Sequence, residues 1–202
     1  MSGPVDPRRV DWSGDNPGIY LKTDPQGEFA SLCVWFRVAL SPHGPGHVLV
    51  LFETPTLQAD ANGVVNVCLA DNTPLARWLI DNFCTKFGVF RGAAAFKGLT
   101  VQPMASLDTS GSDAHGARVA VKGPGLEIEL RWDALGEPFA ADVAPEQSGT
   151  GAHRMLSVFV ESADASITVN GRRLPGAPVP RPFLGRSASS AFLAFSETWI
   201  AA

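Results

Sequence analysis

Charged and polar side chains within apolar runs are the first candidates for a functional site. Arg37 lies two residues after Trp35, and Glu197 lies two residues before Trp199. Asn66 interrupts a run of valines. A charge flanked by large apolar neighbours is costly to bury unless it is paired. We therefore expect these five residues either to line a ligand cavity, with Arg37 and Glu197 as an internal ion pair or as ligand contacts, or to meet solvent or the N-terminal arm.

A basic segment between Asp164 and Glu197 is the second candidate. It contains no acidic residue, although the whole chain has a net charge of −4. Its arginines are Arg172, Arg173, Arg181 and Arg186. Arginine donates two hydrogen bonds to one carboxylate or phosphate because its guanidinium is a planar fork. We expect Arg181 and Arg186 to bind an anionic group at the mouth of a barrel, the alternative being solvated arginines on a surface loop.

An acid–base pair is the third candidate. Glu137 and Asp142 follow a clear strand pattern, and His153 precedes another. A carboxylate beside an imidazole is the usual arrangement of a general base. If the two strands are neighbours, this group predicts an enzyme acting on an organic-acid or acyl substrate. The alternative is that these are surface groups, since turns between strands collect acidic residues.

A metal site is the fourth candidate. His43 and His47 flank a Gly-Pro-Gly turn, and Glu53 lies six residues further on. Imidazole and carboxylate together could hold zinc or another divalent ion if the turn brought the two histidines together. The spacing matches no specific metal motif, and loose matches are often false. We therefore expect no metal and no other cofactor.

The elements that would position these side chains are mostly β-strands. Short runs rich in β-branched and aromatic residues are separated by 20 glycines and 16 prolines, as in all-β sandwiches and barrels. Predicted strands occupy 29–40, 47–54, 64–70, 98–104, 117–122, 126–132, 155–161, 165–169 and 191–200. Asn170-Gly171 is a strong hairpin signal. One amphipathic helix is expected at about 74–87, with Thr73 as its cap and Gly88 at its end.

The sequence therefore predicts a single mostly β domain over residues 1–202. We expect an antiparallel β-barrel or a strongly curved β-sandwich of roughly 9–10 strands, with the helix packed on it. Residues 1–27 are expected to form an irregular arm, and residues 174–190 a long loop that contains prolines and arginines. The strand count is similar to that of lipocalin-like barrels, and this resemblance implies one small ligand inside the barrel.

Composition narrows the function further. The charge of −4 argues against a nucleic-acid partner, and no apolar run approaches the roughly 18 residues of a membrane span. Cys33, Cys68 and Cys84 form no metal or redox spacing, so we expect reduced core thiols in a cytoplasmic protein.

We expect a protein that binds a small, largely apolar ligand with an anionic end, such as an anionic amphiphile. The alternatives are the enzyme above and a carbohydrate- or protein-interaction module with exposed tryptophans; formation of a homo-oligomer stays open.

Overall fold

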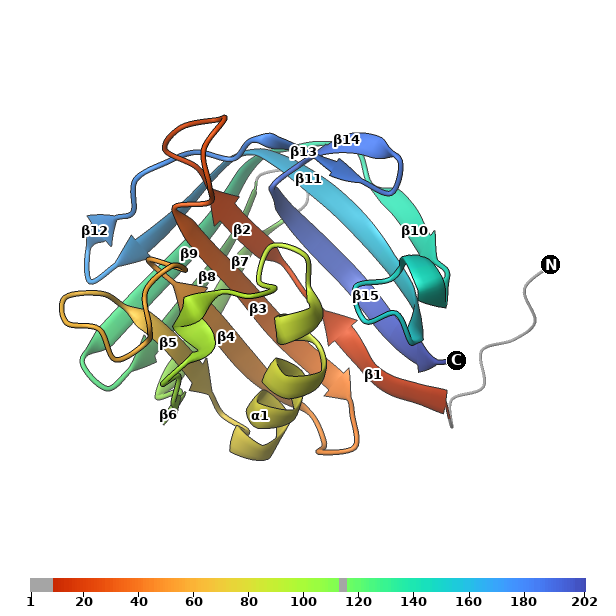
Figure 1. The fold of residues 1–202 in the computed structure, drawn as a ribbon, viewed down its shortest axis with the longest axis horizontal. Helices are drawn as coiled ribbons and strands as arrows, with labels where there is room; N and C mark the ends of the chain where they lie inside the picture. Colours follow the sequence, from red (N-terminus) through yellow and green to blue (C-terminus); the bar gives the residue numbers. More distant parts are fainter. Residues whose placement is uncertain (1–8, 113–115) are drawn as a thin grey trace.

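The computed structural model describes residues 9–112 and 116–202, which form a mostly β structure with one α-helix (Figure 1). The strands are β1 (Val10–Asp15), β2 (Gly18–Leu21), β3 (Ser31–Leu40), β4 (Gly46–Phe52), β5 (Asn66–Ala70), β6 (Val101–Pro103), β7 (Ser106–Ser112), β8 (Gly116–Gly123), β9 (Leu126–Leu135), β10 (Phe139–Val143), β11 (His153–Val169), β12 (Arg172–Arg173), β13 (Pro180–Phe183), β14 (Arg186–Ser189) and β15 (Ala191–Ala201). The helix is α1 (Thr73–Asn82). No helix in the described ranges is long and apolar enough to cross a membrane.

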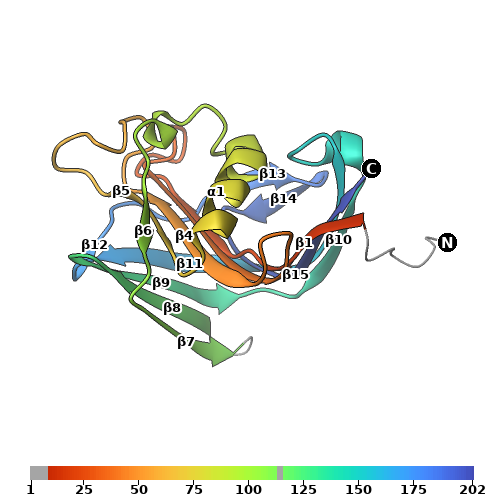
Figure 2. The same ribbon diagram turned by 90° about the horizontal axis from the view of Figure 1, so that it is seen from below.

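Thirteen of the described strands belong to one strongly curved sheet. Its main order is β6-β5-β4-β3-β1-β15-β11-β9-β8-β7, and every pair is antiparallel except β5 with β6. Figure 2 shows β7, β8 and β9 lying beneath β3, β4 and β5. The two edge strands, β6 and β7, follow each other along the chain and are joined by Met104 and Ala105. Met104 N–H donates to the carbonyl of Ala70 in β5, and Ala105 N–H donates to that of Lys122 in β8, so this link is hydrogen-bonded to both ends of the sheet. The predicted barrel-like, curved sheet is confirmed.

The inner face of this sheet is packed with side chains. Alternate residues of each strand point inwards, so Leu49 and Leu51 meet Ile128, Leu130 and other residues of the opposite strands. Trp132, which is fully buried, also lies in this inner core, and its indole N–H donates to the carbonyl of Gly18 at 3.0 Å. The space that a lipocalin-like barrel would leave for a ligand is thus occupied by the protein's own core.

The outer face of the sheet is covered by α1, the chain that follows it and the β13–β14 hairpin (Figures 1 and 2). The helix begins where the Asn72 side chain accepts a hydrogen bond from the N–H of Leu75. It is shorter than expected: it ends at Asn82, and a 3₁₀ turn follows because Phe83 leaves helical geometry at φ −126°. The caps differ as well, since Asn72 rather than Thr73 caps the helix and Gly88 does not end it.

Two segments expected to be irregular contain strands. The described part of the arm forms β1 and β2, whose Trp12 and Tyr20 are buried beneath the outer cover; residues 1–8 lie outside the described residues. The expected loop at 174–190 contains the β13–β14 hairpin, which turns at Leu184 and Gly185, both with positive φ. Pro180 and Pro182 made this segment look like a loop in the sequence, because within a sheet proline occurs only in edge strands and at bulges.

Candidate ligand cavity

A cavity of about 390 Å³ lies between the outer face of the sheet and its cover, partly under the hairpin. This volume is within the usual range for small-molecule sites. Its walls are mainly aromatic: Phe29, Phe87, Phe159, Phe183, Phe192 and Trp199 line it. Four further side chains bring polar atoms to the lining, namely Asn16, Tyr20, Arg181 and Glu197. The cavity is therefore apolar along most of its wall and polar at a few points.

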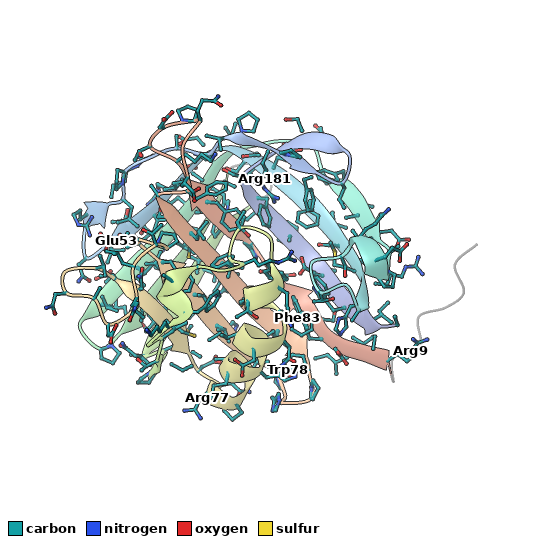
Figure 3. The ribbon with its side chains drawn as sticks, in the orientation of Figure 1. Arg9, Glu53, Arg77, Trp78, Phe83 and Arg181 are labelled. Carbon is teal, nitrogen blue, oxygen red and sulfur yellow. The ribbon has the colours of Figure 1, made fainter. Side chains whose placement is uncertain are left out.

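Arg181 supplies the positive charge of this cavity. Its guanidinium lies 4.8 Å from the ring centre of Phe183, 5.3 Å from that of Phe192 and 5.7 Å from that of Tyr20. Burial lowers the pKa of Arg181 from its ordinary value. Among the described residues, no carboxylate lies within the 4.0 Å of an ion pair, and its Nε has no hydrogen-bond partner. Aromatic faces stabilise the cation, and its N–H donors can bind an anionic group. Figure 3 labels Arg181 on the hairpin side of the outer face.

Glu197 is the acidic group of the cavity. Its Oε1 accepts hydrogen bonds from Asn16 Nδ2 at 3.0 Å and from Trp199 Nε1 at 2.7 Å. Its Oε2 makes no hydrogen bond within the described part of the chain. The residue is 3% exposed, and this burial raises the pKa of Glu197 to about 7, against the two hydrogen bonds that lower it. The carboxyl is therefore oriented through one oxygen and titrates near neutral pH.

A β-bulge at Ser196 turns Glu197 towards the cavity. Leu193 belongs to the inner core, and strict alternation would place Phe195 and Glu197 on that same inner face. Ser196 adopts φ +50°, and the pairing of β15 with β11 shifts there. The shift puts Glu197 on the outer face instead. Bulges re-aim side chains in this way and are frequent next to functional sites.

Arg37 pairs with Asp15 rather than with Glu197. Arg37 Nε donates to Asp15 Oδ2 at 2.7 Å, while Asp15 Oδ1 accepts from the backbone N–H of Ser196 at 3.0 Å. The Arg37 side chain is 60% exposed. The expected ion pair inside a cavity is thus not formed, because the two side chains lie on different sides of the sheet. Arg37 instead neutralises the carboxylate that holds the bulge.

The remaining expected cavity residues lie elsewhere. Trp35 faces the inner side of the sheet, where it stacks on His47 and lines a smaller cavity of about 200 Å³. Asn66 donates to backbone carbonyls of the loop after β4. Arg186 lies 3.0 Å from Glu161 and 4.2 Å from the ring centre of Phe139, so it fastens the hairpin to the sheet. Of the seven expected residues, the structure brings Arg181, Glu197 and Trp199 together in one cavity.

The acid–base candidates do not converge. His153 Nε2 is bonded to Asp11 Oδ2 at 2.6 Å, and its Nδ1 to Thr150 Oγ1 at 2.8 Å. Asp142 binds Arg154 at 2.7 Å, a hydrogen bond that lowers the pKa of this carboxyl. Glu137 is exposed. The expected pairing of His153 with Glu137 or Asp142 is absent from the described structure, because His153 is bonded to Asp11 and Asp142 to Arg154, while Glu137 is exposed.

The metal candidates are also separated. His47 binds Asp71 at 2.7 Å, and Glu53 binds Arg172 at 2.7 Å. His47 and Glu53 stand at opposite ends of β4, roughly 20 Å apart by strand geometry. His43 packs against the ring of Trp78. Within the ranges that the structure describes, no three His, Cys, Asp or Glu side chains are grouped as metal ligands would be.

Sequence reasoning missed two polar residues of the cavity, Asn16 and Tyr20. Both lie in the proline- and glycine-containing segment that was expected to be an arm, and the only signal for Tyr20 was that it is the single tyrosine of the chain. Comparison with known proteins adds no relative to this picture: no family model, no curated protein and no solved structure matches the chain.

Proposed function

We propose that this protein binds a small, largely apolar ligand with an anionic end in the cavity beneath the hairpin. The observation that carries the proposal is Arg181, a mostly buried guanidinium with no carboxylate within 4.0 Å among the described residues. Glu161, which pairs with Arg186, acts on Arg181 only from beyond this distance. Buried charges in proteins are normally paired. A carboxylate or phosphate of the ligand would complete this pair and would accept the two parallel hydrogen bonds that a guanidinium donates.

The walls of the cavity support an apolar body for the ligand. Seven aromatic side chains, Tyr20 among them, line it. Binding sites for small molecules commonly combine such walls with a few placed polar groups. The site differs from the lipocalin-like expectation in one respect. The cavity lies outside the curved sheet, between the sheet and its cover. Trp132 and its neighbours fill most of the inner face, where the cavity lined by Trp35 measures about 200 Å³.

The two alternative functions have less support. In the enzyme alternative, His153 would be the general base. Its two ring nitrogens are bonded to Thr150 and Asp11, and the Thr150 hydroxyl also accepts a hydrogen bond from the N–H of Ala152, so these contacts hold a turn together. His153 does not line the cavity. An interaction module needs exposed tryptophans, whereas four of the five are at most 5% exposed and Trp78 is half-buried. Ligand binding is therefore the function we favour.

Calorimetric titration of matched ligands tests the proposal. We expect octanoate to bind about tenfold more tightly than octanamide, because a charged hydrogen bond to a buried arginine is worth roughly 1.5–3 kcal/mol. The preference should disappear in Arg181→Ala. The control variant is Arg173→Ala, which removes an arginine of the same basic segment that is 62% exposed. Equal affinity for both ligands, or a preference that survives in Arg181→Ala, would overturn the proposal.

A further inference from the structure

Glu197 is a second unpaired ionisable group in the same cavity, with a charge opposite to that of Arg181. Within the described chain, no arginine, lysine or histidine lies within 4.0 Å of its carboxyl oxygens. Arg181 and Glu197 do not form an ion pair with each other either, since their charged atoms are more than 4.0 Å apart. Oε1 is fixed by Asn16 and Trp199, which leaves Oε2 as the oxygen available to a bound molecule.

The two groups stand near opposite ends of the cavity. Arg181 lies over the ring of Phe192, and Glu197 follows Phe192 by five residues along β15. Five residues of strand correspond to roughly 15 Å. Tyr20 lines the same cavity, and its ring centre is 5.7 Å from the Arg181 guanidinium. Burial raises the pKa of its phenol, Arg181 lowers that pKa and Glu197 raises it.

Aromatic rings surround the acidic end. Trp199 stacks with Phe87 at 5.8 Å between ring centres, and both line the cavity beside Glu197. Trp199 presents its N–H edge to Glu197 Oε1. The other carboxyl oxygen can accept a charge-assisted hydrogen bond from an organic ammonium group. Two titratable groups interact with Glu197. Asp15 of β1 lines the other side of the sheet, and its carboxylate raises the pKa of Glu197. Tyr20 of β2 lines the same cavity as Glu197.

We propose that the ligand is zwitterionic, with an anionic group at Arg181, an organic ammonium group at Glu197 and an apolar chain or ring between them. This inference rests on the proposed function, because it uses the same cavity and the same anion contact. Neither Arg181 nor the ionised form of Glu197 has an ion-pair partner within 4.0 Å among the described residues, so one molecule that carries both charges would complement both groups. When the ammonium group enters, Glu197 loses its proton to solvent and the buried pair becomes neutral overall.

The test is a calorimetric comparison of octanoate, ω-aminooctanoate, ω-aminododecanoate and octylamine. At least one of the ω-amino acids should bind about tenfold more tightly than octanoate, because it satisfies both ends. In Glu197→Gln, which keeps an oxygen acceptor for Asn16 and Trp199, this advantage should vanish while octanoate affinity stays. Arg181→Ala should weaken the three acids and leave octylamine unchanged.

A second measurement uses the unsubstituted protein and does not depend on the folding of any variant. At pH 6, where Glu197 is mostly protonated, binding of the ω-amino acid should release close to one proton, whereas octanoate should release none. Titrations in buffers of different ionisation enthalpy measure this release. Equal affinities for octanoate and both ω-amino acids, or binding without proton release, would overturn the zwitterion inference. Octanoate preferred over octanamide would in that case leave the proposed function standing.

Discussion

The carboxylate of Asp15 accepts a hydrogen bond from the backbone N–H of Ser196 at 3.0 Å. This contact joins β1 to the bulge of β15 that turns Glu197 towards the cavity. The other oxygen of Asp15 is bonded to Arg37 at the surface. A residue that lines the opposite side of the sheet therefore controls the direction of a cavity side chain through the backbone between them.

Replacing Asp15 should disturb both stability and binding. We expect Asp15→Ala to lower the free energy of unfolding by about 1–3 kcal/mol, because it removes the charged acceptor of the Ser196 N–H and leaves Arg37 without its partner. Ligand affinity should fall as well, since Glu197 loses its fixed direction. Urea unfolding and calorimetry measure the two effects. Asp164→Ala removes a carboxylate that is 67% exposed, so it serves as the control and should change neither quantity.

The bulge itself can be tested at Ser196, whose φ of +50° favours glycine. A β-branched side chain is strongly disfavoured in this conformation, so Ser196→Val should destabilise the protein by about 1–3 kcal/mol. Ser196→Gly should keep or slightly raise the stability, because glycine adopts this backbone without strain. Urea midpoints of the two variants give the comparison. If valine and glycine behaved alike, Ser196 would not be in a left-handed conformation in solution.

Most of the fold was predictable because it depends on local patterns. The alternation in 126–132 and the apolar runs in 29–40 and 47–54 all correspond to strands, and Asn170-Gly171 forms the expected hairpin turn. The β13–β14 hairpin was not predictable in this way, since two of the four residues of β13 are prolines. Propensity also says little about segments such as β1 and β2, which become strands through tertiary pairing with β3 and β15.

The cavity was only partly predictable, because the sequence does not reveal which faces of different strands meet. Trp35 and Trp199 both belong to alternating runs, yet they lie on opposite sides of the sheet. The position of Glu197 depends on a single extra residue in β15. A shift of one residue exchanges the two faces of a strand, so periodicity alone would place Glu197 on the same face as Phe195.

The packing of the outer cover can be tested at Phe83. This residue is fully buried, and its ring lies 5.1–5.9 Å from the rings of Trp12, Trp78, Trp199 and His153. Phe83→Ala should lower the free energy of unfolding by about 3–5 kcal/mol, since it leaves a cavity in this cluster. Leu57→Ala is the control, because Leu57 is 44% exposed. A urea midpoint for Phe83→Ala equal to that of the parent protein would contradict the packing described here.

The pH dependence of stability tests the environment of Glu197. Burial raises its pKa from the ordinary 4.5 to about 7, so the folded protein binds this proton more tightly than the unfolded chain does. Its contribution to stability is fully present below pH 4.5 and is lost as the pH rises towards 7, after which it stays constant. Over this window the free energy of unfolding should fall by up to ~3 kcal/mol relative to that of Glu197→Gln.

Urea unfolding of both proteins at intervals from pH 4 to about pH 8 measures this difference, and every other titrating group cancels in the comparison. The glutamine variant is a close match, because its side-chain oxygen can still accept from Asn16 and Trp199. Bound ω-amino acid should flatten the fall, since an ammonium group beside Glu197 favours the ionised form. Parallel pH curves for the two ligand-free proteins would mean that Glu197 is hydrated in solution, with an ordinary pKa and without the buried environment that the zwitterion inference requires.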